Sequence, residues 1–529
     1  MKKGLYYLFF IFLALTSCTT SAQTTAKPSV PYSIKGHIDG LADTTIYLAN
    51  YYGNKLYYND TTQVDSKGNF KFNGKPYNEC GKYALVMPGP KYFDFIVADE
   101  NIFIQCNADN DVEKIVIKES QNNKVFFEYI RYINEKRKLR EPIDLCLNDS
   151  TKLESQKAPC MAELKKLNDE VVAYQKDLIK KYPDLLAVKM IRMALEPEAP
   201  KAPEALTDDE KLRWQYYWFR EHYWDNCDLK DPRLVREQQF HRLVENYLTK
   251  TLPQIPDTMC VEVKKLIDRT AGNEDAFKYI THLATYTAET SKVMCMDRFF
   301  VYMVDNYYAK GLCNWMKADK IEEMKKSANE KRHCLCGETA LDIILPDVTG
   351  KKWVSMKENK GEYTMVVIWE SSCGHCKKEV PKLLDVYHKH KDKGLKVYAI
   401  GNELENDKWI TFIQEKGLDW INVSDTPEIM KQDSATKLVL NGTTTIESLN
   451  YRTHWDVNST PKVFLMDKDM KIIAKQLSAE QFDELLDKLE KGEELKMENL
   501  KETEYEDEDH PAPTGRTNMK PRTQSPPKK

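Results

Sequence analysis

The spacing of hydrophobic and polar positions changes twice along the chain, and each change marks a new structural region. Between residues 32 and 117 apolar side chains recur at alternate positions, as Ile34 and Ile38 do around Lys35 and His37. A period of two is that of a β-strand whose faces meet different environments. Short runs of this kind, separated by turn residues, predict a small all-β domain of six or seven strands.

From residue 122 to 331 the period becomes 3.6. Phe240, Val244, Tyr247 and Leu248 fall at helical spacing and form one apolar stripe. Similar stripes recur through this part of the chain. They predict a central all-α domain.

Residues 335–492 alternate between strands and helices. Met365–Trp369 reads as a buried strand, Gly374–His390 as a helix, and Lys462–Asp467 as the first strand of a terminal hairpin. Alternation that closes with an antiparallel hairpin predicts an α/β domain with a mixed sheet. The remaining residues, 497–529, are acidic and then rich in proline and basic residues, which predicts a disordered tail.

The first 22 residues are typical of a signal peptide. Two lysines precede the apolar run Gly4–Leu15, which is shorter than the roughly 20 residues that span a bilayer. The run ends in Leu15-Thr16-Ser17-Cys18, which resembles the bacterial lipobox, while simple cleavage after Ala22 is the alternative. We therefore expect an exported protein on the periplasmic side of the bacterial cell envelope, anchored by lipid on Cys18.

Composition excludes several classes of protein. The 529 residues are 41% hydrophobic and 30% charged, which argues against both a polytopic membrane protein and a wholly disordered one. The net charge is −4, so no global basic field points to nucleic acid. Thirteen cysteines are too few for a disulfide scaffold of this length.

The motif that carries chemistry is Cys373-Gly374-His375-Cys376, between the buried strand and the helix. A structural zinc site would need a second cysteine pair at suitable spacing. Cys334 and Cys336 are the nearest candidates, but one intervening residue fits such a pair poorly. The motif therefore favours redox chemistry, and we expect no metal site.

Position predicts a role for each cysteine. Cys373 lies at a helix N-terminus, where unpaired amides and the helix dipole favour a thiolate, and His375 can add positive charge. Cys376 lies one turn later, where it can resolve a mixed disulfide. Thr460-Pro461 precedes a strand, and a cis bond there would present polar backbone groups to an extended substrate.

Glu379 lies one turn beyond Cys376 on the same helix. A partly buried carboxylate at this position could take the proton from Cys376. The alternative is a solvated glutamate on the helix surface.

Together these residues resemble the thioredoxin superfamily, and they are most similar to the envelope-anchored TlpA/ResA-like thiol-disulfide oxidoreductases. The resemblance covers residues 335–492 and implies a thioredoxin-like fold. It implies catalytic roles for Cys373 (attacking thiol), Cys376 (resolving thiol), Glu379 (carboxylate) and Pro461 (cis-proline), and substrate-binding roles for Trp369, Thr460 and His375. Val367 replaces the buried aspartate of thioredoxin itself, and Ser372 replaces the usual tryptophan before the first cysteine.

The leading hypothesis is an exported oxidoreductase that reduces or exchanges disulfides of envelope proteins, with oxidation and isomerisation left open. Its redox group would be the Cys373–Cys376 disulfide, without a further cofactor. Its partners would be cysteine-containing envelope proteins and an electron donor or acceptor, for which a membrane protein is one candidate. A peroxidase is disfavoured because Glu370 stands where a threonine would precede the reactive cysteine by three residues.

The alternative hypothesis is an envelope lipoprotein whose first 330 residues bind a ligand or partner, with the redox domain as an auxiliary. The other ten cysteines are interpreted as core residues or structural bridges. Cys334 and Cys336 adjoin the redox domain, but sequence cannot decide which cysteines pair.

Overall fold

The computed structural model describes residues 33–72, 80–89, 91–109, 111–403, 406–425, 429–493 and 500–503. The predicted signal peptide, with Cys18, and most of the predicted tail lie outside these residues. The chain divides into two compact units. The first holds nearly all of the β domain, most of a long helical hairpin and residues 182–188, and the second holds the helices beyond residue 188 and the C-terminal domain.

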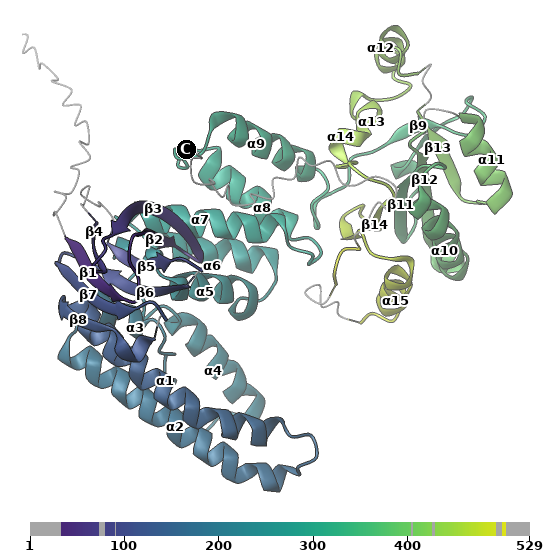
Figure 1. The fold of residues 1–529 in the computed structure, drawn as a ribbon. Coiled ribbons are helices and arrows are strands. Elements are labelled where there is room, and N and C mark those ends of the chain that lie inside the picture. The colour runs from purple at the N-terminus through teal and green to yellow at the C-terminus, as the bar shows by residue number, and fades with distance from the viewer. Residues whose placement is uncertain are drawn as a thin grey trace, which may run out of the picture. The chain divides into compact units, whose positions relative to one another are not determined.

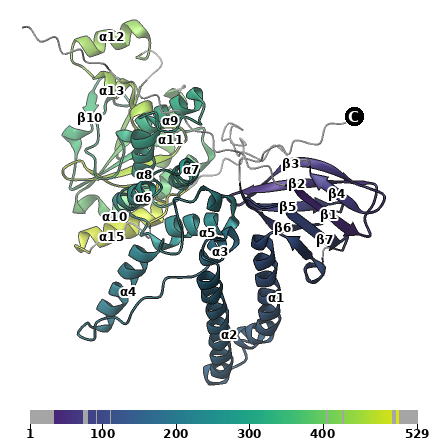
Figure 2. The ribbon, with the colours of Figure 1, turned by 90° about the vertical axis from the view of Figure 1, so that its left-hand side faces the viewer.

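The first unit begins with two four-stranded sheets that enclose a common core, as Figure 2 shows. Their orders are β4-β1-β7-β8 and β3-β2-β5-β6. The core contains Ile34, Leu48, Phe95 and Ile104, which come from both sheets. The strands are β1 (Ile34–Asp39), β2 (Thr44–Tyr52), β3 (Lys55–Val64), β4 (Asn69–Phe72), β5 (Gly81–Met87), β6 (Lys91–Val97), β7 (Ile102–Asn107) and β8 (Val116–Glu119). The all-β prediction is confirmed, although the described residues contain more strands than expected.

Two long helices follow the sheets, α1 (Gln121–Asn148) and α2 (Glu154–Lys181). They run side by side as a hairpin (Figure 2), with the rings of Tyr132 and Tyr174 4.1 Å apart between centroids. A disulfide between Cys146 and Cys160 joins them close to the turn.

The other helices up to the C-terminal domain are shorter: α3 (Leu186–Arg192), α4 (Asp208–His222), α5 (Gln238–Asn246), α6 (Pro256–Asp268), α7 (Glu274–Glu289), α8 (Asp297–Met303) and α9 (Ala318–Arg332). The predicted stripe from Phe240 to Leu248 is buried, as its spacing requires. No helix in the described part of the chain has both the length and the apolar character needed to cross a membrane.

The C-terminal domain is built on a five-stranded mixed sheet in the order β13-β12-β11-β14-β15 (Figure 1). The first three strands in that order are parallel, and the last two join antiparallel. The elements are β9 (Ile344–Pro346), β10 (Trp353–Ser355), β11 (Tyr363–Trp369), α10 (Gly374–His390), β12 (Leu395–Gly401), α11 (Asn406–Lys416), β13 (Ile421–Ser424), α12 (Gln432–Leu440), α13 (Ile446–Leu449), α14 (Tyr451–His454), β14 (Lys462–Asp467), β15 (Ile472–Lys475) and α15 (Ala479–Glu490). The predicted α/β domain is confirmed.

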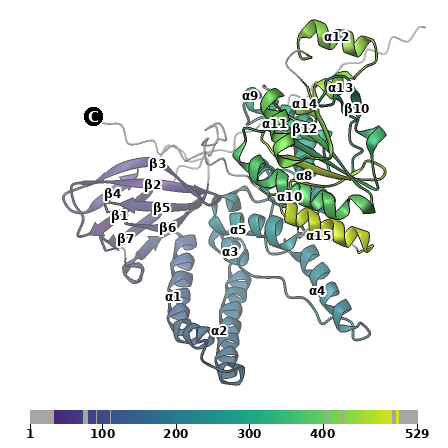
Figure 3. The ribbon, with the colours of Figure 1, turned by 90° about the vertical axis from the view of Figure 1, so that its right-hand side faces the viewer.

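Each face of this sheet is covered differently. The helices α10 and α15 lie side by side on one face (Figure 3) and share a core with the strands. The other face is covered by α14 and by the segment that enters the domain. That segment forms a bridge at Thr339–Lys471, directly before β15, and another to β13 at Asp347–Val423. It therefore crosses the sheet from one edge to the other.

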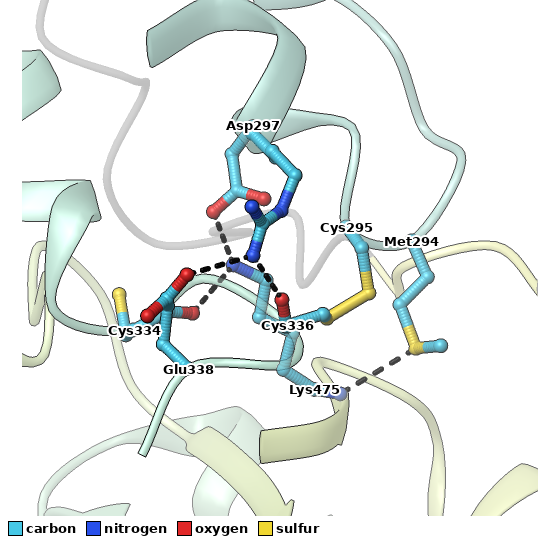
Figure 4. The surroundings of a disulfide bond; sticks show 8 residues. Met294, Cys295, Asp297, Cys334, Cys336, Glu338 and Lys475 are labelled. Atoms are coloured by element: carbon cyan, nitrogen blue, oxygen red, sulfur yellow. Dashed lines mark hydrogen bonds and ion pairs between the residues drawn. A yellow bond between two sulfur atoms is a disulfide. The ribbon is translucent and has the colours of Figure 1, made fainter. Parts of the chain in front are cut away.

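A disulfide between Cys295 and Cys336 ties the loop before α8 to the start of the C-terminal domain (Figure 4). Beside it the buried ammonium of Lys475 forms an ion pair with Asp297 and donates to the backbone oxygen of Cys334 at 3.0 Å. Cys334 itself is a buried free thiol. One disulfide and one buried cation thus hold this junction.

Residues 500–503 belong to the predicted disordered tail, and here the prediction is wrong. The backbone of Leu500 accepts a hydrogen bond from Met294 at 3.0 Å, and Glu502 donates one to Lys292 at 2.8 Å. The Lys475 cation also attracts the largely buried carboxylate of Glu502. Backbone pairing and this charge contact give a short polar segment a fixed place.

Candidate active site

Cys373 is the N-cap residue of α10, just beyond the loop that follows β11. The first amides of a helix lack partners within the helix and donate to an acceptor at its end. Here the acceptor is sulfur, because the backbone N–H of Cys376 donates to Cys373 Sγ over 3.3 Å. Both residues are free thiols, Cys373 partly exposed and Cys376 fully buried. A substrate can therefore reach the first sulfur only.

The two thiols differ strongly in acidity. A hydrogen bond with the Cys376 side chain is the largest cause that lowers the pKa of Cys373 to about 5; burial opposes it, and backbone amides add to it. Burial is the largest cause that raises the pKa of Cys376, and the contact with Cys373 adds to it. At neutral pH the exposed sulfur is thus a thiolate and the buried one a thiol.

The loop before β14 lies against Cys373. Ile368, near the end of β11, pairs with Lys462 at the start of β14, so the loops at these strand ends meet. The Thr460–Pro461 peptide bond is cis. Cys373 Sγ lies 3.4 Å from the backbone oxygen of Thr460, to which the sulfur can donate when it is protonated. The structure therefore brings Thr460 and Pro461 to the reactive sulfur.

The two other expected substrate-binding residues, His375 and Trp369, differ in their exposure to solvent. His375 is partly exposed between the cysteines, and its backbone contributes to the lowered pKa of Cys373. The Trp369 side chain is fully buried, with its ring 5.0 Å from that of Phe412 between centroids. The expectation that Trp369 contacts a substrate is therefore wrong in this structure, because the side chain has no exposed surface. It packs in the core beneath the site.

Glu379 is buried, and its carboxylate is engaged by its neighbours. One oxygen accepts the backbone N–H of Ala479, in the first turn of α15, at 2.6 Å. The other lies 3.6 Å from the ammonium of Lys382. The alternative of a solvated surface glutamate is thus excluded, and proton transfer from Cys376 to this carboxylate stays a prediction.

Sequence reasoning missed a polar cluster beside the cysteines. Its members directly follow the three parallel strands: Glu370 after β11, Asn402 and Glu403 after β12, and Asp425 after β13. Arg452 of α14 donates to Asn402 at 2.5 Å and to Asp425 at 2.9 Å. The ends of parallel strands meet at one edge of a sheet. Polar residues directly after three buried strands were therefore the signal that could have found this cluster.

One group of metal-binding side chains occurs in the described part of the chain: His390, Asp487 and Glu490. Both ring nitrogens of His390 already contact carboxylates, Nε2 that of Asp483 at 2.8 Å and Nδ1 that of Glu490 at 2.6 Å. This arrangement is an ion-pair cluster that joins α10 to α15. It lies apart from the cysteine motif in the sequence and does not include it.

Three family matches divide the chain at nearly the boundaries described above. Residues 32–126 match the family described as "Domain of unknown function (DUF4369)", and residues 152–334 match "Domain of unknown function (DUF5106)". Residues 336–475 match the "AhpC/TSA family". The redox motif lies in the third match.

Curated relatives match the same C-terminal part. A thiol-disulfide oxidoreductase ResA from Bacillus thuringiensis is 27% identical over 158 residues, which is 30% of this chain and 78% of the relative. The ResA of Bacillus cereus is 26% identical over 162 residues, 31% of this chain and 81% of the relative.

Solved structures resemble the chain as well. A thioredoxin-like protein from Bacteroides caccae is 19% identical, with a TM-score of 0.40, and the match covers 55% of this chain and 97% of that one. A domain of a possible thiol-disulfide isomerase from Cytophaga hutchinsonii is 30% identical, with a TM-score of 0.25, and the match covers 30% of this chain and 95% of that domain.

The family match and the ResA relatives agree with the fold of the C-terminal domain, which holds the cysteine pair at the start of α10. We conclude that the C-terminal domain belongs to the TlpA/ResA-like members of the thioredoxin superfamily, and that the chain is a thiol-disulfide oxidoreductase.

Proposed function

We propose that this protein reduces or exchanges disulfides of cysteine-containing proteins in the bacterial envelope. The observation that carries the proposal is the pairing of an exposed sulfur of lowered pKa, Cys373, with a buried thiol, Cys376, one helical turn away. Such a pair can attack a disulfide and then release the product. Location on the periplasmic side, with a lipid on Cys18, completes the proposal and rests on the sequence of residues 1–22.

The reaction takes place in two displacements. The Cys373 thiolate attacks one sulfur of the substrate disulfide, the other substrate sulfur leaves as a thiolate, and a mixed disulfide forms. Cys376 then attacks Cys373 Sγ, the second substrate sulfur leaves, and the proton of Cys376 passes to that departing sulfur. The substrate gains two electrons, and the Cys373–Cys376 pair becomes a disulfide. The backbone of Thr460 lies beside the reacting sulfur throughout and can orient an extended substrate.

Trapping tests this assignment. The Cys376→Ser variant of the full chain should accumulate a mixed disulfide with a model substrate such as insulin, whereas Cys373→Ser should form none. The wild-type protein should reduce insulin catalytically in the presence of a dithiol. Equal insulin reduction by wild type and Cys373→Ser would exclude the proposed function. Labelling with a radioactive fatty acid, compared between wild type and Cys18→Ala, tests the anchor separately.

A further inference from the structure

A second carboxyl group lies at the cysteine pair, that of Glu370. Its backbone oxygen accepts the N–H of Cys373 at 3.3 Å. Its backbone also forms a hydrogen bond that lowers the pKa of the Cys376 thiol. Glu370 is therefore fixed with respect to both sulfurs.

The side chain of Glu370 is held by a chain of hydrogen bonds. The amide of Asn402 donates to the Glu370 carboxylate at 2.5 Å. The oxygen of that amide accepts from Arg452 at 2.5 Å and from the hydroxyl of Tyr451 at 3.2 Å. The Arg452 guanidinium in turn binds both oxygens of the fully buried Asp425. Three parallel strands and α14 thus combine to position one carboxyl group.

Charges of both signs face this carboxyl group. Burial is the largest cause that raises the pKa of Glu370, and the hydrogen bond from Asn402 opposes it. The negative charges of Glu403 and Cys373 raise this pKa further, whereas the Arg452 cation lowers it. Glu403 is itself fixed, because its carboxylate accepts the backbone N–H of Ser371. Electrostatic coupling is mutual, so the charge on Cys373 changes the proton affinity of Glu370.

The charge on Cys373 changes during the proposed redox cycle. In the reduced protein its sulfur is a thiolate, and in the disulfide it is neutral. We infer that Glu370 is a redox-linked proton site: its carboxyl group holds a proton while Cys373 is a thiolate and releases it when Cys373 is in a disulfide. This inference rests on the proposed function. Glu379 is less suited to the role, because both of its oxygens are engaged by Ala479 and Lys382.

With Glu370 as a proton site, the electrons and protons of the reaction balance. A dithiol that reduces the Cys373–Cys376 disulfide gives up two electrons and two protons and becomes a disulfide. The bond between the two protein sulfurs breaks, Cys376 takes one proton, and Cys373 remains a thiolate. The second proton goes to the Glu370 carboxylate. Oxidation of the protein returns both protons.

The experiment is the reduction potential of the full chain against glutathione, measured across pH. For a two-electron couple, each proton taken up changes the equilibrium constant tenfold per pH unit, or about 30 mV. Just above the pKa of Cys373, wild type should approach two protons per two electrons, and Glu370→Gln should take up one. Glu447→Gln, which changes an exposed carboxyl group of the same domain, is the matched control that should keep the wild-type proton number.

The outcomes are distinct. An unchanged pH slope in Glu370→Gln, or a proton lost in Glu379→Gln instead, would overturn the inference. A wild-type protein without any measurable potential would refute the proposed function itself. If Glu370→Gln does not fold, infrared difference spectra of wild type decide the matter, because reduction should produce a protonated carboxyl band. The absence of that band overturns the inference.

Discussion

The backbone amide of Cys376 and the sulfur of Cys373 form a hydrogen bond of 3.3 Å across one turn of α10. The same two residues also interact through their thiols, and this contact is the largest cause of the lowered pKa of Cys373. The resolving cysteine therefore has a role before it ever attacks, since it helps to stabilise the thiolate that starts the reaction.

Loss of the Cys376 thiol should raise the pKa of Cys373. Cys376→Ala removes the side-chain hydrogen bond and keeps the backbone amide, so the pKa should move from about 5 toward its ordinary value. Cys376→Ser is the matched control, because a hydroxyl can still donate, and its effect should be smaller. Thiolate absorbance in the ultraviolet, titrated with acid, measures both. Identical titrations of wild type and Cys376→Ala would contradict this account.

The rate of alkylation of Cys373 should fall only in acid. The lowered pKa means that the thiolate is fully present at neutral pH and disappears as pH falls through about 5. The rate of reaction with iodoacetamide should therefore be flat near neutrality and fall about tenfold per pH unit below pH 5. Cys373→Ser identifies the background from other thiols. A rate that still climbs between neutral and alkaline pH would show an ordinary thiol.

The reduction potential should lie between those of thioredoxin and DsbA. A stabilised thiolate stabilises the reduced protein, which makes the disulfide more oxidising. Thioredoxin, with an attacking cysteine of pKa about 7, has a potential near −270 mV, and DsbA, with one of about 3.5, has one near −120 mV. Equilibration with glutathione gives the value. A potential below that of thioredoxin would mean that interactions of the disulfide form outweigh those of the thiolate.

Removal of the Cys295–Cys336 disulfide should destabilise the second unit. The bond closes a loop of 41 residues, and the loop-entropy model then gives a loss of about 4 kcal/mol for the double serine variant. The Cys146–Cys160 disulfide closes 14 residues, so its double serine variant should lose about 3 kcal/mol from the first unit. Urea unfolding without reductant measures both losses. Wild-type stability in the first variant would show that the bond is not formed in solution.

Replacement of Lys475 should cost more than replacement of a surface lysine. Lys475→Met leaves the carboxylates of Asp297 and Glu502 without their buried cation, and breaking such a pair costs about 3–5 kcal/mol. Lys389→Met, which removes partly exposed pairs with Asp483 and Asp487, should cost at most about 1 kcal/mol. Addition of Asp297→Leu to Lys475→Met should restore part of the loss. Equal destabilisation by the two lysine substitutions would refute this assignment.

The sequence allowed good prediction wherever the cause of structure is local. Helix α10 has the predicted bounds, because a buried strand, a cysteine cap and an apolar stripe follow one another within 30 residues. Contacts distant in sequence were not predictable. Arg452 lies 50 residues from Asn402, and nothing in either segment indicates the other. The partner of Cys336 was open for the same reason, since any of several cysteines satisfied the pattern.

The burial of one side chain, that of Trp369, explains another difference between the expectations and the structure. Trp369 was expected to contact substrate because of the resemblance to the thioredoxin superfamily, but a strand side chain can point to either face. Its side chain points into the core. The period of two predicts which residues share a face, and only the packed structure shows which face a substrate can reach.

The segment that enters the C-terminal domain crosses the sheet and bridges both outer strands, at Lys471 and at Val423. An open strand edge is a template on which an extended polypeptide can pair. At these two positions the backbone already has a partner within the chain, so an extended polypeptide cannot pair there. The partly exposed sulfur of Cys373 and the loop beside it stay accessible to a substrate.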